Sequence, residues 1–166
     1  MNFEEHTNKC LNTWIRDDTA LERTELGLIE EVGEVAGKHK KFLRGDYDKE
    51  EYDRLVLGEL GDVLFYLTMN CYENNINIKE FALPNRVIKS NTFEYIKQLN
   101  KNVSKLLKIP NDEETLILHY VVVVISNIID IANQSGYTLQ QVANANIEKL
   151  SKRKINGTIK GSGDDR

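Results

Sequence analysis

The sequence contains few prolines, few cysteines and no apolar run long enough to span a membrane. Only two of its 166 residues are proline and only two are cysteine. So few prolines leave room for long helices. Cys10 and Cys71 lie far apart without a CxxC pair, which argues against a disulfide framework and against a zinc site. No apolar run approaches the ~18–20 residues that span a bilayer, so we expect the longest one, around residues 121–125, to lie in a core.

The chain also lacks an excess of positive charge and a secretory leader pattern. Its formal net charge is −4, which gives no electrostatic reason to expect binding to a nucleic-acid duplex. The first residues do not show the basic-then-apolar pattern of a signal peptide, so we expect a cytoplasmic protein. Free nucleotides, which can bring their own magnesium, remain compatible with this charge.

Helix signals, by contrast, are abundant. Five pairs with capping-box spacing precede apolar-periodic segments: Thr19 with Glu22, Asp48 with Glu51, Asn77 with Glu80, Asn91 with Glu94 and Thr138 with Gln141. They predict helices at residues 2–16, 19–44, 48–74, 78–83, 91–108, 112–135 and 138–154. Residues 121–131 are rich in β-branched side chains, but we favour helix because no partner strand is apparent in the sequence. We predict one all-α domain over residues 1–154 and a glycine-rich tail over residues 155–166.

Two acidic clusters stand out on the second and third predicted helices. An α-helix advances ~100° per residue, so Glu30, Glu31 and Glu34 border the core-facing stripe of one helix, while Glu59 and Asp62 share the apolar face of the next. An ionised carboxylate removed from water needs a compensating cation. Lysine or arginine is one candidate, but the third predicted helix has no basic residue between positions 55 and 69. Mg²⁺, which prefers oxygen ligands, is favoured.

The pattern EExxE, a 24-residue interval and ExxD resembles the MazG nucleotide pyrophosphohydrolases of the all-α NTP pyrophosphatase superfamily. The match covers about residues 24–72 and resumes near the C-terminus, where the tail is similar to that of phage-type members. The resemblance implies an all-α antiparallel helical bundle that uses Mg²⁺, with Mn²⁺ as a substitute, to hydrolyse a (d)NTP between its α- and β-phosphates. It also implies a homo-oligomer of two or more copies in the cytosol of a bacterium or a phage-infected cell.

Roles for individual residues follow from this resemblance and from their chemistry. Glu31, Glu34, Glu59 and Asp62 would bind the metal, and Glu30 would orient or deprotonate the attacking water or bind metal instead. The candidates for binding substrate are Trp14, which would stack on the base, and Lys38, Lys41, Asn146, Lys149, Arg153, Lys160 and Arg166, which would contact ribose or phosphates. The non-functional interpretations of the same residues are solvated lysines, a disordered tail and a tryptophan buried in the core.

A faint internal repeat links the two halves of the chain. Residues 28–34 align with residues 95–101, and in the following helices Glu59 stands opposite Tyr120 and Asp62 opposite Val123. Every carboxylate of the first half is thereby replaced in the second. We predict that residues 91–135 are a degenerate copy of the catalytic helix pair at residues 19–74. Such an internal duplication resembles the arrangement in dimeric dUTPases. Convergence between two amphipathic helix pairs is the alternative.

Three functional hypotheses remain at this point. The first is an Mg²⁺-dependent nucleoside triphosphate pyrophosphohydrolase, which could be as narrow as a dUTPase or dCTPase. The second is a non-catalytic nucleotide-binding or regulatory protein of the same fold. The third, a purely structural bundle, predicts salt bridges around Glu59 and Asp62. One tryptophan and a few polar groups on helix faces do not distinguish uracil from the other bases.

Overall fold

The computed structural model describes residues 1–78 and 90–159, and within these ranges the chain is all helical, without a strand. The six helices are α1 (Phe3–Leu11), α2 (Ala20–Arg44), α3 (Lys49–Glu73), α4 (Thr92–Leu106), α5 (Glu114–Gln134) and α6 (Leu139–Ile155). The predicted all-α bundle is confirmed. Most of the helix expected at 78–83, and residues 160–166 of the tail, lie outside the described residues.

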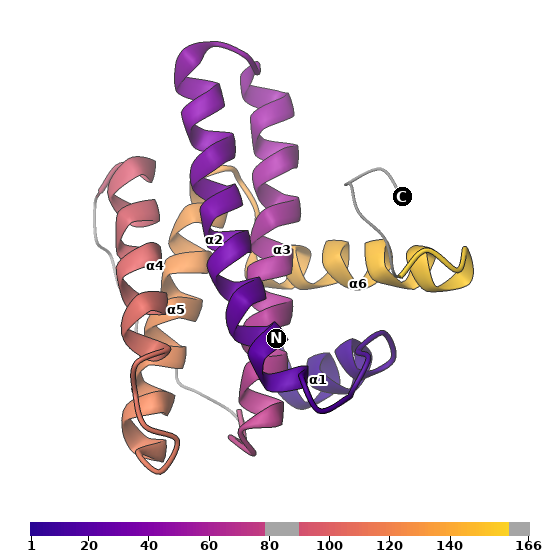
Figure 1. Ribbon diagram of the computed structural model, residues 1–166. Helices are drawn as coiled ribbons and strands as arrows, with labels where there is room; N and C mark the ends of the chain where they lie inside the picture. Colours follow the sequence, from indigo (N-terminus) through magenta and orange to yellow (C-terminus); the bar gives the residue numbers. More distant parts are fainter. Residues whose placement is uncertain (79–89, 160–166) are drawn as a thin grey trace.

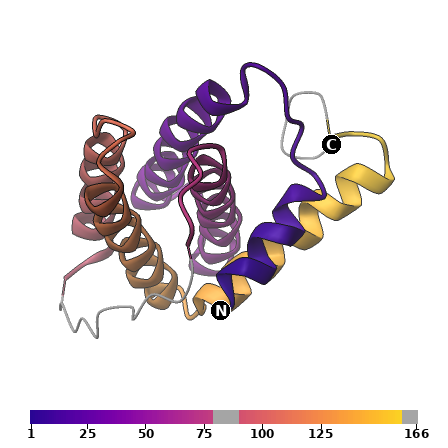
Figure 2. The ribbon, with the colours of Figure 1, turned by 90° about the horizontal axis from the view of Figure 1, so that it is seen from below.

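The two longest helices, α2 and α3, form a hairpin at the centre of the bundle (Figure 1). The chain reverses between them at Gly45, whose φ of 87° lies in the left-handed region that favours glycine. Helices α4 and α5 form a second hairpin beside the first, with α4 against α2 and α5 against α3. Helix α6 runs across the axes of α2 and α3, and α1 lies alongside it, as the view from below shows (Figure 2).

The helix starts follow the predicted capping signals at three of the five positions. The Asp48 side chain caps α3 by accepting a hydrogen bond from the Glu51 backbone N–H, and the Asn91 side chain caps α4 by accepting one from the Glu94 backbone N–H. Thr138 and Gln141 form a complete capping box at the start of α6. At Thr19 the predicted helix start is confirmed, since α2 begins at Ala20, but the predicted capping bond is absent, because the Thr19 hydroxyl donates to Asp17 Oδ1 at 2.7 Å. The box predicted from Asn77 to Glu80 extends outside the described residues.

The first helix is shorter than the predicted span of residues 2–16, because α1 ends at Leu11. The Thr13 hydroxyl donates to the Cys10 carbonyl at 3.1 Å, which competes with continued helix. Beyond this turn the Trp14 ring packs edge-on against Phe65 of α3 at a centroid distance of 6.0 Å. A contact with a helix about fifty positions away leaves no periodic signal in the local sequence, so periodicity alone overextended the helix.

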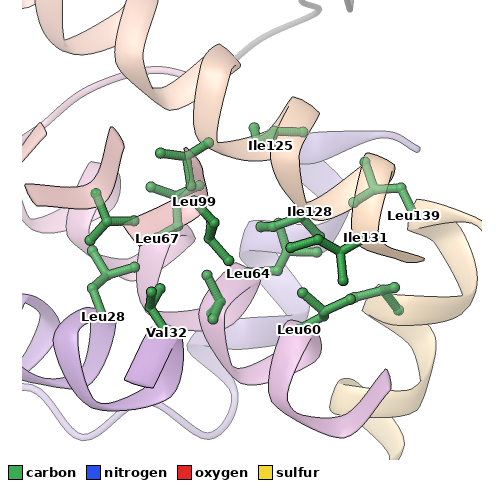
Figure 3. Close-up of a cluster of buried hydrophobic side chains, with 14 of the residues drawn as sticks. Leu28, Val32, Leu60, Leu64, Leu67, Leu99, Ile125, Ile128, Ile131 and Leu139 are labelled. Atoms are coloured by element: carbon green, nitrogen blue, oxygen red, sulfur yellow. The ribbon is translucent and has the colours of Figure 1, made fainter. Parts of the chain in front are cut away.

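The core is a continuous apolar cluster to which all six described helices contribute, and Figure 3 shows part of it. Its labelled members are Leu28 and Val32 of α2, Leu60, Leu64 and Leu67 of α3, Leu99 of α4, Ile125, Ile128 and Ile131 of α5, and Leu139 of α6. The β-branched stretch of residues 121–131 is helical, as predicted. Helix α5 is long and apolar enough, by length and composition alone, to cross a bilayer, but half of that apolar window is buried inside the bundle, as in a core helix.

Candidate metal centre and nucleotide site

The two acidic clusters meet on one side of the α2–α3 hairpin. Glu31 and Glu34 lie one turn apart on α2, and Glu59 faces them from α3. One carboxylate oxygen from each of these three residues lies within 4.8 Å of the other two. Such convergence of hard oxygen donors is what a divalent cation requires. The structure therefore brings together three of the four predicted metal ligands as a group.

The electrostatics of this group are unfavourable without a cation. Burial, followed by the charges of Asp62, Glu59 and Glu34, raises the pKa of Glu31 to about 9. Burial also raises the pKa of Glu59, although the hydrogen bond from Lys38 opposes that shift. Glu31 is thus held as a neutral acid at pH 7 unless a positive charge arrives beside it. Desolvation and mutual repulsion of this kind concentrate at functional sites.

Two lysines already pair with carboxylates of the site. Lys38 Nζ lies 3.0 Å from Glu59 Oε1, and Lys149 of α6 pairs with Asp62. These are the salt bridges that the structural-bundle hypothesis predicts. They compensate only part of the charge, because among the described residues no basic side chain forms an ion pair with Glu31 or Glu34. The charge of Lys149 opposes the rise in the pKa of Glu31 without cancelling it, so the two lysines leave the acidic group only partly compensated.

Helix α6 reaches the site through a close contact with α3. A Cβ at Gly61 would lie 2.8 Å from the Cβ of Asn146, so only glycine lets Asn146 settle beside Asp62. There its Nδ2 donates to Asp62 Oδ1 at 2.6 Å. Its Oδ1 is buried with no hydrogen-bond partner among the described residues. An orphaned acceptor costs free energy, and a bound ligand or a metal-bound water would satisfy it.

Tyr66 belongs to the site, although sequence reasoning gave it no role. Its ring packs directly against Gly27, where an added Cβ would approach to within 2.4 Å. The carboxylates of Glu31 and Asp62 contribute, after burial, to raising the pKa of its phenol, so the ring borders the acidic group. The signal was present in the sequence, because Tyr66 lies one turn beyond Asp62 on the same helix face.

Trp14 also contacts Tyr66. Its ring meets Tyr66 edge-on at a centroid distance of 6.5 Å, and its Nε1–H donates to Glu73 Oε1 at 2.7 Å. The Arg23 guanidinium sits 4.8 Å from the centroid of the Trp14 ring. Trp14 therefore joins the chain after α1 to the C-terminal end of α3, and it is half-buried rather than enclosed.

The remaining predicted site residues are more scattered. Glu30 is exposed on α2 beside the metal group, and Arg153 lies on α6 one turn beyond Lys149. Lys41 instead reaches toward the Tyr47 ring, 5.9 Å from its centroid. Lys160 and Arg166 lie outside the described residues.

The donor set fits magnesium better than a softer metal. Carboxylate oxygens suit Mg²⁺, Ca²⁺ or Mn²⁺. The cysteines, Cys10 and Cys71, are buried, and neither belongs to the acidic group. Glu31, Glu34 and Glu59 could hold one ion, with Asp62 next to them. The Asn146 and Lys149 side chains would then stand between that ion and α6.

Comparison with known proteins agrees with this geometry. A family model described as dUTPase matches residues 4–157, which is most of the chain. This helical family is related to the MazG-type pyrophosphatases, and the match names dUTPase rather than MazG itself. No curated protein and no solved structure matches the chain.

Proposed function

Because the chain belongs to the dUTPase family, we propose that it is an Mg²⁺-dependent pyrophosphohydrolase that converts dUTP to dUMP and pyrophosphate. Family membership supports nucleotide hydrolysis, and the choice of dUTP follows the family's description. The observation that carries the metal dependence is the acidic group of Glu31, Glu34 and Glu59, whose ligand atoms converge within 4.8 Å. Two of these carboxylates lack a basic partner among the described residues.

The metal would be held by Glu31, Glu34, Glu59 and Asp62. When bound, Mg²⁺ supplies charge neutralisation at the phosphates and lowers the pKa of a bound water. Glu30, exposed at the edge of the group, would accept the proton of the attacking water. Lys38 and Lys149, which pair with Glu59 and Asp62 in this structure, would turn toward phosphate oxygens.

The order of residues across the site suggests how the nucleoside lies. Tyr66 contacts the Trp14 ring and lies close enough to the acidic group for its carboxylates to raise the pKa of the Tyr66 phenol. A triphosphate bound at the acidic group would place the sugar near Tyr66 and the base near Trp14, because the sugar connects base and α-phosphate. Asn146 Oδ1 would accept a hydrogen bond from the ligand or its water.

The alternatives differ in what they require of the same residues. A dCTPase would use the same metal group and differ only at the base. A non-catalytic nucleotide-binding protein would not need Glu30 beside an uncompensated metal site. The purely structural bundle accounts for the ion pairs of Lys38 and Lys149 but not for Glu31 and Glu34.

One experiment tests the proposal. The purified protein is incubated with Mg²⁺ and each canonical or deoxy nucleoside triphosphate in turn, and pyrophosphate is measured. We expect release from dUTP above all others and its loss with EDTA. Release of orthophosphate would refute cleavage between the α- and β-phosphates, a preference for dCTP would transfer the proposal to the cytosine nucleotide, and no release from any nucleotide would refute the enzyme.

A further inference from the structure

A cavity lies between α4 and α5, in the hairpin to which the proposed function gives no role. It has a volume of about 530 Å³, and its lining includes Tyr95 and Asn102 of α4 and Tyr120, Asn127 and Asp130 of α5. Ligand pockets in proteins commonly have volumes of about 300–1,000 Å³, whereas one water molecule takes up about 30 Å³ in the liquid. The cavity is therefore large enough for a small organic molecule.

Two buried amides on the wall of this cavity each keep a polar group without a partner. Asn102 is 8% exposed and Asn127 4%, and Asn102 Nδ2 donates to Asn127 Oδ1 at 2.8 Å. Asn102 Oδ1 and Asn127 Nδ2 make no hydrogen bond with the residues that the structure describes. Neither is one of the fully enclosed atoms without a partner, and the cavity is a space that both residues line. The amide pair thus offers an acceptor and a donor to a ligand.

The charges that line the cavity favour an uncharged ligand over a phosphate. The two carboxylates of Glu94 and Asp130 outnumber Lys105, the one lysine or arginine among the described lining residues. The Lys105 ammonium lies 5.6 Å from the centroid of the Tyr120 ring. Phosphates are bound by clusters of basic groups or by a metal. Within the described ranges, the one set of three converging metal ligands is that of the first hairpin.

The aromatic part of the wall favours a planar ligand. Tyr95 is buried and Tyr120 half-buried where they line the cavity, and the His119 ring meets Tyr120 edge-on at a centroid distance of 5.2 Å. Tyrosine rings offer stacking surfaces to flat heterocycles. Amide side chains recognise the edges of such rings because they donate and accept hydrogen bonds at the same time. Rings and amides together therefore suit a nitrogen heterocycle.

We propose that the cavity between α4 and α5 is a second ligand site, which takes an uncharged nitrogen heterocycle with donor and acceptor groups, as in a nucleobase or a nucleoside. Asn102 Oδ1 accepts a hydrogen bond from the ligand and Asn127 Nδ2 donates one. In the internal repeat Asn127 aligns with Tyr66 and Tyr120 with Glu59, so the second site corresponds in position to the first without its metal ligands. The proposal does not depend on the proposed function, because this site needs neither metal nor hydrolysis.

A titration followed by NMR tests the site. The full ¹⁵N-labelled chain, in EDTA to keep metal away from the acidic group, is titrated with adenosine, with deoxyuridine and with the 5′-monophosphate of each. The side-chain NH₂ signals of Asn102 and Asn127 report on the cavity directly. We expect at least one nucleoside to shift both signals at millimolar concentration. Its monophosphate should bind more weakly, because the carboxylates of Glu94 and Asp130 repel the added charge.

Two variants separate this cavity from the acidic group. Replacing both Asn102 and Asn127 with leucine removes the amide pair without stranding a polar group, and the affinity, followed at the backbone signals of Tyr95 and Tyr120, should fall about tenfold or more. Glu34→Gln, which alters only the acidic group, should leave the affinity unchanged. Circular dichroism checks that both variants keep their helices.

Three results would overturn the proposal. If no nucleoside moves the signals of Asn102 and Asn127, the cavity holds water alone. If the shifts are confined to Trp14 and Tyr66 and survive in the double leucine variant, the nucleoside binds only beside the acidic group. If the monophosphate binds more tightly than its nucleoside at this cavity, the ligand is not of the uncharged class.

Discussion

The two helical hairpins pack side by side but differ in the side chains at their aligned positions. In α2–α3 the carboxylates of Glu31, Glu34 and Glu59 converge, and Asp62 pairs with Lys149 of α6. In α4–α5 the positions aligned with Glu31, Glu59 and Asp62 are Gln98, Tyr120 and Val123, and they line a cavity of about 530 Å³. Two buried amides join the helices of the second hairpin, with Asn102 Nδ2 of α4 donating to Asn127 Oδ1 of α5 at 2.8 Å.

The difference teaches that packing of these helices does not require the carboxylates. Equivalent apolar positions are buried in both hairpins, such as Leu64 and Ile125, or Val32 and Leu99. A neutral amide pair satisfies its own hydrogen bonds at little cost, whereas burial and the neighbouring carboxylates raise the pKa of Glu31 to about 9. The first hairpin therefore gives up stability to bring carboxylates together, which is what a binding site does. The duplication that would explain the common shape stays a prediction.

The largest contrast between the hairpins should be in activity. Glu34→Gln and Asp62→Asn each remove a charged metal ligand, and we expect pyrophosphate release to fall by more than the 10–100-fold typical of losing an outer-shell partner. Gln98→Ala, at the position aligned with Glu31, should leave the rate unchanged. Steady-state kinetics measure this, with circular dichroism confirming the fold. Full activity in either acidic variant would place the metal elsewhere.

The next contrast is in pH dependence. Between pH 4.5, the ordinary pKa of the group, and about pH 9, folded metal-free protein keeps a proton on Glu31 that the unfolded chain has released. Its stability should therefore fall as pH rises through this window. Mg²⁺ replaces that proton, so the gain in Tm on adding Mg²⁺ should grow with pH. In Glu31→Gln the decline measured in EDTA should flatten, and an unchanged slope would assign it to another group.

The amide pair of the second hairpin allows a stability test without loss of function. Asn127→Ala leaves the buried Asn102 amide without its partner, which should cost about 1–3 kcal/mol in urea denaturation. Replacing both asparagines with leucine should cost much less, because no polar group is then stranded. dUTP hydrolysis should survive in both variants. A large loss of activity would mean that the second hairpin contributes to the site.

The smallest effect should separate the two helix starts. Asn91 caps α4 with its side chain, so Asn91→Ala should cost about 1 kcal/mol. Thr19 begins α2 without a capping bond, and its contacts to Asp17 and Arg23 are exposed. Thr19→Ala should therefore stay within about 0.5 kcal/mol of the native free energy of unfolding. Equal costs at the two positions would show that Thr19 caps α2 in solution.

Much of the scaffold was readable from local chemistry. Asp48, Asn91 and Thr138 correctly predicted helix starts, because an N-cap hydrogen bond joins residues only three positions apart. The spacing of the acidic residues likewise predicted that they share one face of each helix, because residues three or four positions apart are neighbours on a helix surface. The capping bond predicted at Thr19 does not form, because its hydroxyl donates to Asp17, an alternative partner at a similar distance along the chain.

The sequence by itself determined where helices form and which carboxylates share a face, since those relations repeat every turn. Only the tertiary structure decided that Glu31 and Glu34 form no ion pair with the basic residues that it describes, while Lys149 and Asn146 cross from α6 to Asp62, more than eighty positions away. It also brought Tyr66 into contact with Trp14 and close to the acidic group. The physical reason is that burial and distance between remote helices set the energy of a charge, and neither quantity has a period along the chain.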